Sequence, residues 1–110
     1  MESVPQQLSE YVQPGKCFVF SVTYCPYCVK AKNLLDKLKV KYEKIEVDSI
    51  PKLWNDSKFE SVLVQHSGID TYPKVYIGTT CIGGCDDLHE LHRQNKLFPM
   101  LEKEGINYGN

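Results

Sequence analysis

The residues of this chain best suited to chemistry are two cysteines, Cys25 and Cys28, separated by Pro26 and Tyr27. An apolar, β-prone run lies directly before them, and a run with helical periodicity follows from Val29. The pair is therefore expected where a strand passes into a helix, whose first turn offers unpaired N–H groups and a positive dipole end. Because a thiolate is stabilised there, we expect Cys25 to attack disulfides and Cys28, one turn further on, to resolve the product.

The same pair could instead be half of a zinc site or two buried thiols. A zinc site needs further ligands, and the sequence offers Cys81, Cys85, His89 and His92. These residues fall on a predicted strand, a turn and a helix, so four converging side chains are not expected. In a cytosolic chain, C-x-x-C next to a βαβ pattern is typical of a thioredoxin-like redox motif. We therefore interpret the pair as a redox centre and expect no metal.

The composition predicts one globular domain covering residues 1–110, in a reducing compartment. The chain has 42% hydrophobic and 25% charged residues and a net charge of −1, so no field favours nucleic acid or a membrane surface. Five cysteines is an odd number, which a fully paired secreted framework would not have. The first residues lack the apolar region of a secretory signal. We expect a cytoplasmic monomer.

Periodicity along the chain predicts an α/β fold with the element order αβαβαββαα. A strand, a helix and a strand within about 30 residues form a βαβ unit, so these two strands should be parallel. Asp48 or Ser49 is expected to cap the third helix, and Asp86 or Asp87 the fourth. The expected elements are a leader helix within 1–14, a strand over 17–22, a helix to about 39, a strand over 42–47, one distorted or two short helices over 50–67, strands over 74–77 and 80–82, and two C-terminal helices.

Three motifs stand in the order and at the separations typical of one family. They are Cys25-Pro26-Tyr27-Cys28, Thr71-Tyr72-Pro73 and Gly83-Gly84-Cys85-Asp86-Asp87. Together they resemble a dithiol glutaredoxin of the CPYC type, in the thioredoxin superfamily, from about residue 15 to residue 101. The resemblance implies a thioredoxin-like (glutaredoxin) fold, with a four-stranded mixed sheet flanked by helices on both faces. It also implies a thiol–disulfide oxidoreductase that uses glutathione as co-substrate and acts on disulfide-bearing or glutathionylated proteins.

The resemblance further implies roles for residues around the dithiol. Pro73 should be cis and face the cysteine pair, while the backbone of Tyr72, where the family usually has Val, should pair with the cysteine of the substrate. The backbone N–H groups of Cys85 and Asp86 should bind the γ-glutamyl carboxylate of glutathione, and the Asp86 carboxylate its ammonium. The full set of expected substrate-binding residues is Thr23, Tyr24, Tyr27, Thr71, Tyr72, Pro73, Gly84, Cys85 and Asp86.

Two positions depart from the family pattern. Val22 stands where most members have Lys, and Glu60 where many have Gln, and both family residues help hold the glycine carboxylate of glutathione. Glutathione should therefore bind less tightly at that end, unless Lys52 or Lys58 substitutes. One interpretation is that the protein prefers a polyamine-conjugated thiol such as trypanothione or glutathionylspermidine. The other is neutral drift at a rim position, where single charges contribute little.

Two further alternatives concern cysteines. Some glutaredoxins hold an iron–sulfur cluster between two subunits through the residue equivalent to Cys25 and glutathione, although Pro26 stiffens this loop and argues against it. Cys85, beside the expected groove, is either a regulatory thiol or a small residue tolerated at a variable position. Cys17 is expected to be a core residue, and His66 to interact with carbonyls at a helix end.

Overall fold

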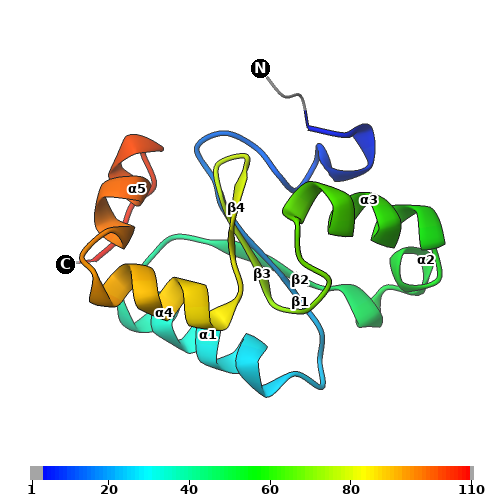
Figure 1. The fold of residues 1–110 in the computed structure, drawn as a ribbon, viewed down its shortest axis with the longest axis horizontal. Coiled ribbons are helices and arrows are strands. Elements are labelled where there is room, and N and C mark those ends of the chain that lie inside the picture. The colour runs from blue at the N-terminus through cyan, green and yellow to red at the C-terminus, as the bar shows by residue number, and fades with distance from the viewer. Residues whose placement is uncertain (1–3, 110) are drawn as a thin grey trace.

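The computed structural model describes residues 4–109, which fold around a four-stranded sheet (Figure 1). The strands are β1 (Cys17–Ser21), β2 (Glu43–Glu46), β3 (Lys74–Ile77) and β4 (Thr80–Gly83), in the order β2-β1-β3-β4. β1 and β2 are parallel, whereas β1 with β3 and β3 with β4 are antiparallel. The mixed sheet and the parallel βαβ unit that the sequence predicts are both confirmed.

The described residues form five α-helices: α1 (Pro26–Lys37), α2 (Pro51–Trp54), α3 (Ser57–Ser67), α4 (Cys85–Arg93) and α5 (Leu97–Lys103). In Figure 1, α1 and α4 run side by side on one side of the sheet, and α3 lies on the other. Helices on both faces were expected from the family resemblance. No helix among residues 4–109 combines the length and the apolar character that crossing a membrane requires.

The sheet separates two apolar cores because neighbouring residues of a strand point to opposite faces. In β1, Cys17 and Val19 face one core, and Phe18 and Phe20 face the other. The first core includes buried residues of α1, α4 and α5: Ala31, Leu35, Leu88, Leu97 and Leu101. The second includes Leu8, Val12, Val47, Phe59, Leu63 and Tyr76. Cys17 is thus the core residue that the sequence predicts, and burial raises the pKa of its thiol to about 12.

The predicted leader helix is wrong for the residues described. Only a 3-10 turn, Gln6–Leu8, forms there, and residues 1–3 lie outside the described part of the chain. Leu8 and Val12 are nevertheless buried in the second core. The spacing of these apolar residues therefore reflects their packing against the sheet, and a single helical turn is enough to place both of them in the core.

Two predicted helix caps are wrong, although the break near residue 55 is confirmed. α2 begins after Ile50 without a side-chain cap, and α3 is capped by Asp56, whose Oδ1 accepts from the Lys58 and Phe59 amides at 3.0 and 3.2 Å. The N-cap residue of α4 is Gly84, and both predicted aspartates lie inside the helix. Asp87 acts from inside the helix, because its carboxylate accepts the Gly84 N–H at 3.0 Å.

The prediction for His66 is also wrong. Its Nδ1 lies 2.8 Å from the Tyr76 hydroxyl, and the two rings stack with their centroids 5.6 Å apart. Tyr76 is fully buried, so its hydroxyl requires a partner inside the protein. His66 therefore satisfies a core tyrosine instead of the end of its own helix.

Candidate active site

Cys25 occupies the N-cap position of α1, directly after the loop that leaves β1. Its backbone is extended, with φ −112° and ψ 108°, and its Sγ accepts the backbone N–H of Cys28 at 3.1 Å. Pro26 fills the first helical position, where its missing N–H costs no hydrogen bond. The sulfur thus lies at the positive end of the helix dipole, in contact with one of the amides that the helix itself leaves unpaired.

The second partner of the Cys25 sulfur comes from a distant segment. The Tyr72–Pro73 peptide bond is cis, as the resemblance implies, and the Tyr72 carbonyl lies 3.6 Å from Cys25 Sγ. The cysteine pair therefore faces the proline loop across a gap short enough for a thiol to donate to a carbonyl. Figure 1 shows how this loop, just before β3, comes to the same end of the sheet as the start of α1.

The two cysteines differ in burial, as the sequence predicts. Cys25 is partly exposed, whereas Cys28 is fully buried. Burial, together with the neighbouring Cys25, raises the pKa of Cys28 to about 11, although contacts with Ser21 and Val22 oppose the shift. Cys28 is therefore a protonated thiol near neutral pH, which suits a sulfur that must wait until Cys25 has reacted.

A groove of about 450 Å³ extends from this site between the proline loop and the start of α4. Its lining consists of Tyr27, Ile69, Thr71, Tyr72, Pro73, Gly84, Cys85, Asp86 and Asp87. All the expected substrate-binding residues except Thr23 and Tyr24 are among them. The sequence prediction did not include Ile69 or Asp87, and only the folded loop shows that Ile69 reaches the groove.

Glycines allow the two walls of the groove to approach each other. A Cβ on Gly84 would stand 3.2 Å from the Pro73 carbonyl oxygen, closer than most side chains tolerate. Gly83 has φ +115°, and a Cβ there would lie 2.1 Å from the Asp87 carboxylate. The first amides of α4 follow directly, so this wall presents unpaired N–H groups to the groove.

Thr23 and Tyr24 do not line the groove. Asp48 accepts the Thr23 N–H at 2.9 Å and the Thr23 hydroxyl at 2.5 Å, and these hydrogen bonds lower the pKa of Asp48. Asp48 therefore fixes the segment that precedes Cys25 instead of capping a helix. Tyr24 is 69% exposed and is not among the lining residues. The position of Asp48 just after β2 could have predicted its contact with Thr23, because neighbouring parallel strands end at the same edge of the sheet.

A polar network beside Cys28 was not predicted from the sequence. The buried Ser21 hydroxyl donates to Glu46 at 2.9 Å, and Lys32 Nζ lies 2.7 Å from the other Glu46 oxygen. Burial opposes ionisation of Glu46, but the hydrogen bonds from Lys32 and Ser21 outweigh it and lower its pKa. Ser21 also contacts Cys28, so a fixed negative charge lies one side chain away from the buried thiol.

The two positions that depart from the family pattern present no cation to the groove. Val22 is buried at 4% exposure, while Glu60 is exposed on α3. The residues lining the groove include neither Glu60 nor the lysines considered as substitutes, Lys52 and Lys58.

The alternative metal ligands do not converge in the structure. Cys85 Sγ lies 3.5 Å from His89 Nδ1, but in residues 4–109 no three side chains of the metal-binding types are placed to hold one ion. Burial and the neighbouring Asp86 charge raise the pKa of the Cys85 thiol. This favours the interpretation of Cys85 as a small packing residue over that of a regulatory thiol.

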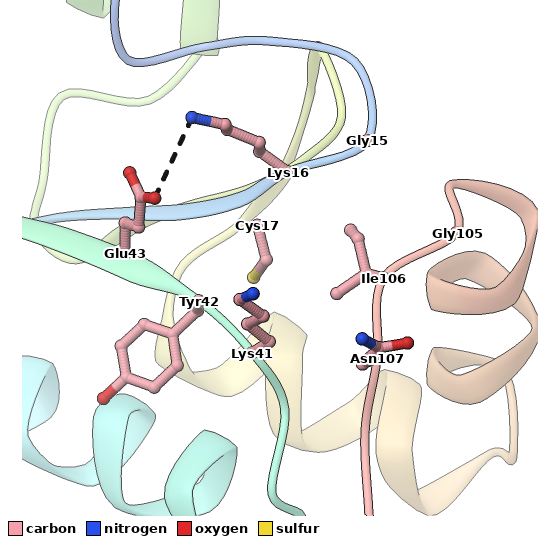
Figure 2. Close-up of a pocket in the computed structure, with 9 residues that line it drawn as sticks. All are labelled: Gly15, Lys16, Cys17, Lys41, Tyr42, Glu43, Gly105, Ile106 and Asn107. Atoms are coloured by element: carbon pink, nitrogen blue, oxygen red, sulfur yellow. Dashed lines mark ion pairs between the residues drawn. The ribbon is translucent and has the colours of Figure 1, made fainter.

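A second hollow, of about 260 Å³, lies at the opposite end of β1 (Figure 2). Its lining includes Lys16, Cys17, Lys41 and Ile106, and Lys16 forms an ion pair with Glu43 at 3.8 Å. The Cys17 side chain points from the strand toward this hollow, but the raised pKa of its buried thiol leaves it unreactive. The reactive chemistry of the chain therefore belongs to the end of the sheet that carries Cys25.

Comparisons with known proteins agree with this geometry. The glutaredoxin family model matches residues 17–82. Glutaredoxin-C2 of Arabidopsis thaliana is 41% identical over 100 residues, which are 91% of this chain and 87% of that protein. A buckwheat glutaredoxin solved as a glutathione complex is 42% identical, with a TM-score of 0.68 over 81% of this chain and 78% of the other. The holo form of glutaredoxin C1 from Populus tremula x tremuloides is 34% identical, with a TM-score of 0.76 over 91% and 94%.

A cysteine pair at a helix N-terminus, opposite a cis-proline on a mixed four-stranded sheet, defines the thioredoxin-like class of thiol–disulfide oxidoreductases. Within that class, this chain belongs to the glutaredoxin family and is an oxidoreductase of the dithiol type.

The difference in burial predicts the order in which the thiols react. With limiting iodoacetamide near neutral pH, we expect Cys25 to be alkylated at least ~10-fold faster than Cys28, because a thiol below its pKa carries little of the reactive thiolate. Peptide mass spectrometry measures both rates. In the Cys25→Ser control, labelling of Cys28 should stay slow until the pH rises well above the ordinary value of 9.0. Equal labelling of both cysteines at neutral pH would contradict the assignment.

Proposed function

We propose that this protein uses glutathione to reduce protein disulfides and protein–glutathione mixed disulfides through Cys25 and Cys28. The observation that carries the proposal is the position of Cys25 Sγ, between the Cys28 amide and the Tyr72 carbonyl at the mouth of the groove. The buckwheat relative, solved with glutathione, supports glutathione as the co-substrate.

The dithiol route is a series of thiol–disulfide exchanges that conserve electrons. The Cys25 thiolate attacks a protein disulfide, forms a mixed disulfide, and displaces the second protein sulfur, which takes up a proton. Cys28 then loses its proton and attacks the Cys25 sulfur, which releases the reduced protein and leaves a Cys25–Cys28 disulfide. Two glutathione molecules supply two electrons, become glutathione disulfide, and restore both thiols.

The monothiol route uses Cys25 alone. Its thiolate attacks the glutathione sulfur of a glutathionylated protein and releases the protein as a thiol. A second glutathione attacks the resulting mixed disulfide, which regenerates Cys25 and forms glutathione disulfide. Cys28 is not needed, because the second glutathione takes the place of the resolving thiol.

The groove has the polar groups that a γ-glutamyl peptide would need. With its sulfur at Cys25, the cysteinyl part of glutathione would pair with the backbone of Tyr72 as a short antiparallel strand does. The γ-glutamyl carboxylate would bind the first amides of α4, at Cys85 and Asp86, because a helix N-terminus favours an anion. The exposed Asp86 carboxylate would then bind the ammonium group.

A polyamine-conjugated thiol is a second candidate substrate, which rests on Val22 and Glu60. The buried Val22 offers no cation, and the exposed Glu60 places an anion where the family often has a neutral amide. An amide-linked polyamine would replace the repelled glycine carboxylate with positive charge. The iron–sulfur alternative is less favoured, because Pro26 occupies the first helical position and stiffens the loop that would hold the cluster.

Single cysteine substitutions separate the two routes. We expect Cys25→Ser to abolish both disulfide reduction and deglutathionylation, because the sulfurs of the two neighbouring cysteines, Cys28 and Cys85, are buried. Cys28→Ser should lose the reduction of protein disulfides but retain deglutathionylation. Turnover of a glutathionylated peptide and of a disulfide-bonded protein, each coupled to glutathione reductase, measures the two activities. An active Cys25→Ser protein would overturn the assignment.

The choice of thiol is tested with glutathione and glutathionylspermidine, which differ only at the glycine carboxylate. We expect Glu60→Gln to raise kcat/KM for glutathione by about 2- to 5-fold, which corresponds to the free energy that one exposed charge contributes. The kcat/KM for glutathionylspermidine should not rise in this way. Glu102→Gln, far along the chain on α5, is the matched control. Wild-type rates with glutathione equal to or above those with glutathionylspermidine would remove the polyamine-thiol candidate.

A further inference from the structure

Lys74 is a buried lysine that the proposed mechanism does not use. It is the first residue of β3, directly after the cis-proline, and only 1% of it is exposed. Lysine is almost never fully buried unless its charge is paired, since removing an ammonium from water is costly. Yet no carboxylate of residues 4–109 forms an ion pair with Lys74.

All partners of the ammonium belong to one short segment. Lys74 Nζ donates to the carbonyls of Ile69 and Thr71, at 3.1 and 2.8 Å. It also lies 4.4 Å from the centroid of the Tyr72 ring, within the range of a cation–π interaction. The ammonium thus connects three residues of the segment 69–72 without lining the groove itself.

The same segment forms one wall of the groove. Ile69, Thr71 and Tyr72 all line it, whereas Lys74 does not. Tyr72 also supplies the carbonyl that faces Cys25. A shift of segment 69–72 would therefore change the width of the groove and its distance from the reactive sulfur together.

We propose that Lys74 is a positioning residue that holds the segment 69–72 at the distance from Cys25 that the thiol co-substrate requires. In this arrangement the Tyr72 ring, where the family usually has Val, completes the surroundings of the ammonium. The inference rests on the proposed function, because the co-substrate it concerns is glutathione.

Stability alone does not explain a lysine at this position. Burial lowers the pKa of Lys74, and the Glu60 carboxylate only opposes that shift. Burying an ammonium that no carboxylate pairs is costly, so an apolar side chain of similar volume should not lower the stability. Ile69 and Thr71 are themselves partly or fully exposed, so their carbonyls can turn to water if the ammonium is lost. An apolar residue in place of Lys74 should therefore leave the fold intact but allow the segment 69–72 to move.

The test compares Lys74→Met with Lys74→Arg, which retains a cation and several donors. We expect Lys74→Met to keep its thermal unfolding temperature but to raise KM for glutathione about 10-fold, with a smaller change in kcat, because misplacing a substrate-binding group by a fraction of an ångström has this effect. Lys74→Arg should recover much of the loss. Lys103→Met, at an exposed position of α5, is the matched control and should leave KM unchanged.

The role of the Tyr72 ring is tested by a double-mutant cycle. If Lys74 acts through Tyr72, the KM increase in Lys74→Met/Tyr72→Leu should be smaller than the product of the two single increases. Cys25 should still be alkylated by iodoacetamide in Lys74→Met, because this reagent does not use the groove and the Cys28 amide that contacts the sulfur lies outside the segment 69–72.

Two results would overturn the inference without contradicting the proposed function. An unchanged KM in Lys74→Met, in a protein that otherwise turns over glutathione, would overturn the role of Lys74 alone. Loss of Cys25 alkylation together with a lowered unfolding temperature would show a merely structural role and would also overturn it. If Lys74→Met does not fold, Lys74→Gln decides by the same KM criterion. A wild-type protein inactive with glutathione would instead refute the proposed function.

Discussion

The structure depends on holding the Cys25 sulfur between two backbone groups, the nearby Cys28 amide and the Tyr72 carbonyl, which lies 47 residues after Cys25. The sheet brings them together through its register. Phe20, near the end of β1, pairs with Lys74, directly after the proline loop, so the chain leading to Cys25 emerges beside that loop. Val75 pairs with Gly83 in the next hairpin, which places the start of α4 beside the same loop. Three separate motifs thus become one site.

Burial then gives two chemically identical side chains different roles. Cys25 remains partly exposed at the helix entrance, whereas Cys28 is enclosed and its pKa is raised to about 11. The attacking sulfur can therefore meet large substrates, and the resolving sulfur stays protonated until a disulfide forms beside it. Polar groups beneath the site are fixed by specific partners, as in the contacts of Glu46 with Ser21 and Lys32.

Much of this arrangement follows from local sequence signals. The strands, the helix after Cys25 and the proline loop each have a periodicity or a motif, and the structure confirms them. Two of the errors concern side chains whose partners are remote in sequence: Asp48 binds Thr23 instead of capping a helix, and His66 binds Tyr76. The burial of Lys74 could not be predicted from the sequence for a related reason. A lysine at the first position of a strand is typical of an exposed boundary, and only the folded loop above it shows that the ammonium is enclosed.

The most direct test of the central claim is a crystal structure of the Cys28→Ser variant after reaction with glutathione disulfide. The geometry predicts one glutathione joined to Cys25 and lying in the groove, with its cysteinyl backbone paired to Tyr72 and its γ-glutamyl carboxylate at the amides of Cys85 and Asp86. Glutathione attached to Cys85 or Cys81 instead, or joined to Cys25 but lying outside the groove, would contradict this account.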